Sequence, residues 1–294
     1  MMAELTFGNA WFSAGGWTWD PELWAFGLAA IWAYALGRRR LRAEGTAGVP
    51  WRAALFYAAL GVTAFALQSP FDALSGSLLS VHMVQHMLLL VVAAPLFAAA
   101  TPWPELRRAM PPRIRARLTR VGKAADGTGW VGKAAQVLWH PATAFVLFVA
   151  TLWIWHIPSL YDLAVHDQLV HEQEHLLFLA TGVLYWSHLL GASWLAARMR
   201  PSQRIVFLVA GMMACWALSI VLIVARTPIY PAYVPVVSTV SGLTPIADQR
   251  LAAGLMWAAG MVPFNLAIVL TVLRLLNGEE QAQIAQAAQP QGVH

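Results

Sequence analysis

Long apolar stretches recur along this chain, separated by shorter segments rich in charge, proline or glycine. Crossing the ~30 Å hydrocarbon core of a bilayer takes roughly 20 helical residues. Segments of about this length lie near 19–37, 51–68, 78–100, 138–156, 168–190, 203–225 and 250–274. The pattern predicts an all-α fold, a polytopic membrane protein whose seven transmembrane helices form one domain over residues 1–277. The Gln/Ala-rich segment 278–294 is predicted to be a disordered cytoplasmic tail.

Basic residues collect in alternate connections between these segments. Clusters follow the first, third and fifth segments, and Arg274 closes the seventh. Of the 19 Lys and Arg residues, only Arg226 and Arg250 lie in the other connections. Because basic residues of membrane proteins gather in cytoplasmic loops, this asymmetry predicts an N-terminus outside and a C-terminus in the cytoplasm of a bacterial-type plasma membrane.

Composition agrees with a lipid environment and restricts the chemistry. The chain is 59% hydrophobic and 11% charged, with a net charge of +5. Since topology accounts for the basic residues, the bilayer is the expected partner and nucleic acid is not. The single cysteine, Cys215, excludes both an intramolecular disulfide and a CxxC site. A metal would therefore be held by histidine, methionine or carboxylate side chains.

Six of the nine histidines fall on the predicted outer side, at the ends of the third, fourth and fifth segments. They are His82, His86, His156, His166, His171 and His175. Ionisable residues at membrane depth are costly and usually face a protein interior or a water-filled cavity. This distribution is the main functional signal in the sequence.

Two HxxxH pairs carry that signal. Residues four apart on a helix share one face, so each pair has chelate spacing. Four imidazoles suffice for copper or zinc, and thioethers beside them suit copper better than magnesium or calcium. Met83 and Met87 alternatively pack between helices. The predicted ligands are His82, His86, His171 and His175, with His156 and Met83 as additional candidates.

Several polar residues on the same side are candidates to orient these imidazoles. A ligating histidine normally donates its other N–H to a carboxylate or carbonyl. The candidates are Asp72, Gln85, Glu174 and Asp248. His166 lies between acidic residues of a short connection, where ordinary solvation explains its polarity.

Other chemistries compete with an assembly or metal-binding role. The segment 171–175, HEQEH, satisfies the zinc-protease signature, with Glu172 as general base and Asp72 or Asp248 as third ligand. A membrane zinc metalloprotease is therefore the main alternative, although it would not need His82 and His86. Bis-histidine haem ligation is a third possibility. A transporter is disfavoured because the middles of the predicted spans are almost free of charge.

The chain also resembles a known family. The segments 82–89 (HMVQHMLL), 155–158 (WHIP) and 171–179 (HEQEHLLFL), with Asp248-Gln249 and Met256-Trp257, are similar to multispan cytochrome c oxidase assembly factors of the CtaG type, associated with caa3-class oxidases. These blocks follow the family's order from the third to the seventh span. Glu172 departs from the family pattern, in which an apolar residue more often precedes a single glutamate. That departure weakens Glu172 as a protease base.

The resemblance implies a non-enzymatic role in maturing a copper centre of cytochrome c oxidase on the extracytoplasmic side. The implied metal is copper, with zinc as the alternative, and the implied partners are oxidase subunits or copper chaperones. Histidine and methionine ligands also suit an oxidising compartment, where a cysteine pair is prone to oxidation.

Overall fold

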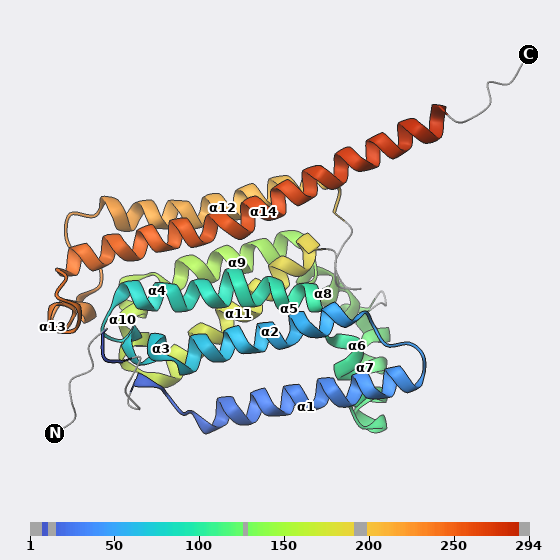
Figure 1. The fold of residues 1–294 in the computed structure, drawn as a ribbon, viewed down its shortest axis with the longest axis horizontal. Helices are drawn as coiled ribbons and strands as arrows, with labels where there is room; N and C mark the ends of the chain where they lie inside the picture. Colours follow the sequence, from blue (N-terminus) through green and yellow to red (C-terminus); the bar gives the residue numbers. More distant parts are fainter. Residues whose placement is uncertain (1–7, 11–15, 126–128, 191–198, 288–294) are drawn as a thin grey trace, which may run out of the picture.

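Long helices run beside one another through most of the molecule (Figure 1). The structure is a computed structural model, and it describes residues 8–10, 16–125, 129–190 and 199–287. Those residues contain helices and turns but no strand. The prediction of an all-helical fold is therefore confirmed.

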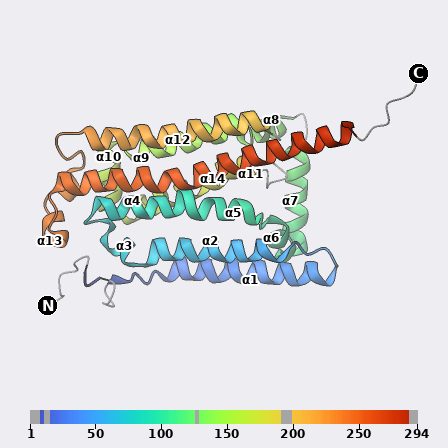
Figure 2. The same cartoon turned by 45° about the horizontal axis from the view of Figure 1, so that its top comes forward.

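Each predicted apolar segment overlaps one long helical stretch. The stretches are α1 (Pro21–Ala43), α2 (Pro50–Gln68), α4 (Leu79–Met87) continued by η2 (Leu88–Ala93) and α5 (Ala94–Ala100), α9 (Pro141–Trp155), α11 (Gln168–Leu190), α12 (Pro201–Val224) and α14 (Pro245–Ala287). Shorter helices cover the two ends of this bundle (Figures 1 and 2). α3 (Pro70–Ser75), α10 (Pro158–His166), η3 (Pro231–Tyr233) and α13 (Val237–Ser241) lie at one end, and α6 (Trp103–Ala109), α7 (Pro112–Ala125) and α8 (Trp130–Leu138) at the other.

Length and hydropathy identify the clearest membrane-crossing helices among the described residues. Four stretches qualify, namely Pro50–Gln68, Leu79–Ala100, Pro201–Val224 and Pro245–Asn277. α8 and α9, bent by 58°, qualify together as a fifth. α1 and α11 run beside these helices but carry, respectively, an arginine cluster and the HEQEH segment. The chain is thus a helical membrane protein, while the seven-span count and the orientation stay predictions.

A π-helical segment interrupts the third stretch just beyond the histidine pair. In the π register a carbonyl accepts from the N–H five residues later. For Leu90 that residue is Pro95, which has no N–H. The indole of Trp186 on α11 donates to the Leu90 carbonyl instead, at 3.1 Å. This bond ties η2 to the helix that carries the second histidine pair.

The C-terminal prediction needs correction. α14 continues through Ala287, so residues 278–287 are helical and not a disordered tail. Ala, Gln and Glu are good helix formers, and they extend a helix that is already nucleated by the apolar residues before them. Residues 288–294 of the predicted tail lie outside the described part of the chain.

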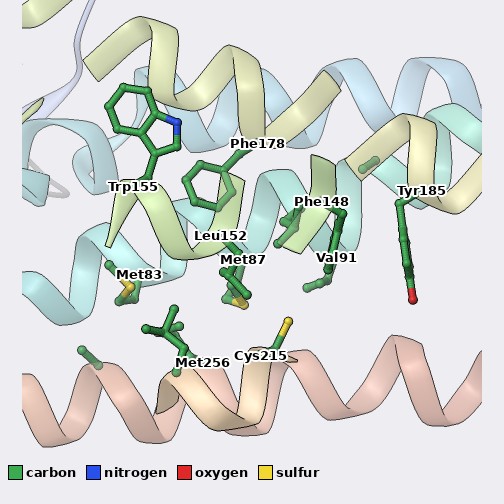
Figure 3. Close-up of a cluster of buried hydrophobic side chains, with 14 of the residues drawn as sticks. Met83, Met87, Val91, Phe148, Leu152, Trp155, Phe178, Tyr185, Cys215 and Met256 are labelled. Carbon is green, nitrogen blue, oxygen red and sulfur yellow. The ribbon is translucent and has the colours of Figure 1, made fainter. Parts of the chain in front are cut away.

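The main apolar core fills the space between α4, α9, α11, α12 and α14 (Figure 3). Met83, Met87, Phe178, Cys215 and Met256 are all buried in it. Met83 and Met87 therefore do pack between helices, as one interpretation of the sequence proposed. The histidine pairs lie on the same two helices that supply this packing, α4 and α11.

Candidate metal site

The two HxxxH pairs face each other across α4 and α11. Within the pairs, the ring centroids lie 4.3 Å apart for His82 and His86, and 4.2 Å apart for His171 and His175. Across the helices, His82 is 5.0 Å from His171 and His86 is 5.5 Å from His175. All four predicted ligands therefore meet in one cluster.

Glu174 lies within this cluster. Its two carboxylate oxygens are each 3.5 Å from an imidazole Nε2, one of His82 and one of His86. All three side chains are fully buried. The residue predicted to orient the imidazoles thus has oxygens placed where they can bind a metal directly.

The donor atoms of the cluster lack hydrogen-bond partners among the described residues. They are Nε2 of His82, His171 and His175, both ring nitrogens of His86, and both oxygens of Glu174. Leaving a buried polar atom unpaired costs free energy, so such a concentration of donors is typical of a site that binds an ion. Ligands about 2.1 Å from one tetrahedral ion lie about 3.4 Å apart, close to the 3.5 Å found around Glu174.

Two overlapping sets of three donors can hold an ion. One contains His82, His171 and His175, and the other contains His82, His86 and Glu174. In each set the three donor atoms lie within 4.8 Å of one another. His82 belongs to both sets and therefore lies at the centre of the cluster.

Tyr233 fixes the tautomer of that central histidine. Its hydroxyl donates to the Ser75 carbonyl at 3.0 Å and lies 2.9 Å from Nδ1 of His82. Burial raises the pKa of Tyr233, so the phenol stays protonated. Because its one proton is directed to Ser75, the phenol oxygen accepts from His82, which places the imidazole proton on Nδ1 and leaves Nε2 free for a metal.

Aromatic rings enclose the cluster on its other sides. Phe178 stacks on His86 at 4.4 Å, and Tyr161 lies 5.0 Å from His82. Tyr230 packs on Tyr161 at 4.1 Å. Tyr230 comes from the connection between α12 and α14, as does Tyr233, so this proline-rich segment folds over the cluster.

His156 and Met83 form a neighbouring pair beside the cluster. Nδ1 of His156 lies 2.6 Å from the Leu152 carbonyl, and Nε2 lies 3.4 Å from the Met83 sulfur. The His156 and His86 rings are 6.2 Å apart. The pair is thus close enough to extend the cluster, with an imidazole and a thioether as its donors.

The other predicted orienting residues hold helices rather than imidazoles. Asp248 accepts from the backbone N–H groups of Leu79 and Ser80 and pairs closely with the Ser80 hydroxyl, capping the start of α4. Gln85 donates to Asp72 at 2.8 Å and to the Ala66 carbonyl at 3.1 Å. These contacts fix α4 and so position its histidines indirectly.

Glu172 and His166 lie away from the cluster. Glu172 is exposed and accepts from Gln168, one turn earlier on α11. It therefore does not face the donors as the base of an HExxH protease would. His166 is exposed and its Nδ1 bonds to the Asp162 carbonyl. This agrees with the prediction that His166 is a solvated residue of a short connection.

Tyr233 is the residue at the site that sequence reasoning missed. It lies in the connection between α12 and α14, 151 residues from His82 along the chain. Tyr161, on α10, is a second such residue. No spacing rule links either tyrosine to the histidines, because the contacts arise from packing between distant segments.

Comparison with known proteins identifies the family of this chain. Residues 32–277 match the model of the cytochrome c oxidase caa3 assembly factor family. Uncharacterized proteins of Mycobacterium bovis and Mycobacterium tuberculosis are each 28% identical over 87% of the chain, and one of Mycobacterium leprae is 24% identical over 92%. The chain spans about two-fifths of the length of these relatives (39–41%). No solved structure matches the chain. The matched region contains every residue of the cluster, and the chain belongs to the cytochrome c oxidase caa3 assembly factor family.

Proposed function

We propose that this protein binds copper at the histidine–glutamate cluster and helps to mature a copper centre of a caa3-type cytochrome c oxidase. One observation carries the proposal: the buried, unpartnered donor atoms of four histidines and Glu174 converge between α4 and α11. Imidazoles with one carboxylate can neutralise and hold a copper ion. The family supplies the oxidase as the destination.

His156 and Met83 favour copper over zinc in this proposal. Thioether sulfur is a soft ligand that selects Cu(I). Ligands 2.1 and 2.3 Å from a tetrahedral ion lie about 3.6 Å apart, and the His156 nitrogen and Met83 sulfur are separated by 3.4 Å. Copper could then move from the imidazoles to this pair on its way to an oxidase subunit or chaperone.

In the same proposal the cluster faces the extracytoplasmic side and the chain has seven spans. The basic residues gather at the opposite end of the bundle, on α1, α6 and α7. The positive-inside rule assigns that end to the cytoplasm. The protein then acts as an assembly factor and not as an enzyme.

The proposal predicts a defect in the oxidase itself. In cells that lack the chromosomal copy, His82→Ala/His86→Ala should leave the caa3 oxidase short of copper and inactive, while its haem and subunits are still made. His140→Ala/His166→Ala, which changes two exposed histidines, is the matched control and should restore the oxidase. Normal copper content with the site variant, present at normal abundance, would refute the proposal.

A further inference from the structure

Helix α7 carries an apolar stripe beside a basic one, away from the metal cluster. Ile114 and Val121, spaced for one helical face, are 51% and 54% exposed. Arg113, Arg117 and Arg120 recur at the same spacing on the adjoining face. No hydrogen bond or ion pair involves these three guanidinium groups within the described part of the chain. A basic amphipathic helix of this kind is typical of a membrane surface.

The orientation of α7 agrees with that interpretation. Figure 2 shows α7 lying across the ends of the long helices, close to the C-terminal end of α1. Exposed tryptophans begin the neighbouring helices: Trp51 in α2, Trp103 in α6 and Trp130 in α8. Tryptophan gathers at the level of lipid headgroups. α7 therefore lies along the plane of the membrane, at headgroup depth.

An open hollow of about 380 Å³ lies between α6 and α7, lined by Pro104, Arg107, Arg108 and Arg115. Arg107 donates to the Thr119 hydroxyl at 2.8 Å, which fixes its position. Arg108 pairs with Glu44. Of the three guanidinium groups that line the hollow, Arg108 is the one that pairs with a carboxylate among the described residues. The hollow therefore keeps an excess of positive charge.

We propose that this hollow binds the phosphate headgroup of an anionic phospholipid, with the apolar stripe of α7 inserted among the acyl chains. Arginine forks match the oxygens of a phosphodiester. Headgroup binding would hold α6 against the end of α1, where Arg40 already donates to the carbonyls of Arg108 and Ala109. The proposal is independent of copper and of the oxidase.

Native mass spectrometry of the purified full chain with phosphatidylglycerol or phosphatidylcholine tests this binding. The chain should retain phosphatidylglycerol preferentially, and Arg107→Gln/Arg115→Gln should weaken that retention about tenfold or more, since each arginine near an anionic surface contributes about 1 kcal/mol. Arg39→Gln/Arg42→Gln removes equal charge from exposed positions of α1 and is the matched control. It should retain the lipid nearly as wild type does.

Three outcomes would overturn the proposal: equal retention of phosphatidylcholine, equal loss in both variants, or displacement of the lipid by inorganic phosphate. Hydrogen exchange of the wild-type chain in nanodiscs gives a test that needs no variant. Amides of residues 112–125 should exchange more slowly when phosphatidylglycerol is present than in phosphatidylcholine alone. Unchanged exchange would contradict the proposal.

Discussion

At the scale of single residues, the proposed metal site depends on side chains that set the state of a ligand as well as on the ligands themselves. Tyr233 directs the proton of His82 to Nδ1, and Glu174 brings negative charge among the imidazoles. An outer contact such as that of Tyr233 typically changes metal affinity 10- to 100-fold. The roles of Tyr233 and Glu174 can each be tested by a substitution that conserves the shape of the side chain.

Tyr233→Phe removes the hydroxyl that accepts from His82 while keeping the ring. Copper affinity should fall about 10- to 100-fold, because the imidazole loses the partner that orients it. Competition against a copper chelator measures the change. Tyr57→Phe, an exposed tyrosine of α2, is the control and should leave affinity unchanged. Equal affinity in both variants would remove Tyr233 from the site.

Glu174→Gln and Glu172→Gln form a matched pair on one helix. Glu174 is buried against two imidazoles, whereas Glu172 is exposed. Glu174→Gln should lower copper affinity at least tenfold, since it removes the negative charge of the carboxylate that lies among the imidazoles, and Glu172→Gln should have little effect. Chelator competition again gives the measurement. The reverse order of effects would show that Glu174 does not hold the copper.

At the scale of elements, the first turn of α14 organises the site from a distance. Asp248 caps α4, and Gln249 accepts from the N–H of Ile229 and donates to the Leu222 carbonyl. Asp248-Gln249 therefore joins the helix of the first histidine pair to the connection that supplies Tyr233. This gives a physical role to a sequence block that the family resemblance included without explanation.

Asp248→Ala should destabilise the fold by about 1 to 2 kcal/mol, the usual cost of losing a helix cap. Thermal unfolding in detergent measures the loss, and Asp248→Asn should retain most of the stability because asparagine also caps well. Copper affinity should fall with Asp248→Ala as α4 loses its anchor. A variant as stable as wild type would show that the cap is unimportant.

Helical spacing alone predicted which histidines share a face of α4 and of α11, because a helix has a fixed period. It could not predict that these faces meet, that Glu174 enters between them, or that Tyr233 arrives from a segment 151 residues away. Those contacts depend on packing between helices. The predicted disorder does not hold for residues 278–287, because Ala, Gln and Glu continue a helix already formed by the apolar residues before them.

At the scale of the whole molecule, the two ends of the bundle have different chemistry. The end with α3, α10 and α13 holds the histidine–glutamate cluster and the tyrosines that contact it, and the end with α6 and α7 holds most of the arginines. A membrane imposes this division, since basic residues stay on the side of synthesis. In the proposed orientation, the histidine–glutamate cluster lies toward one compartment and the basic helix α7 toward the other.

The predicted orientation can be tested with reporters fused to the C-terminus. A green fluorescent protein should fluoresce and an alkaline phosphatase should be inactive, because both report a cytoplasmic position. Fusions within residues 242–244, between α13 and α14, should behave in the opposite way. Active phosphatase at the C-terminus would reverse the orientation and place the cluster in the cytoplasm.

The most direct test of the central claim is the copper content of the purified chain. Elemental analysis after copper loading and removal of loosely bound ions should find copper retained by wild type and by His140→Ala/His166→Ala. The His82→Ala/His86→Ala variant, folded by the criterion of its thermal transition, should lose it. Full copper stoichiometry in that variant, or none in the wild-type protein, would contradict the proposed site.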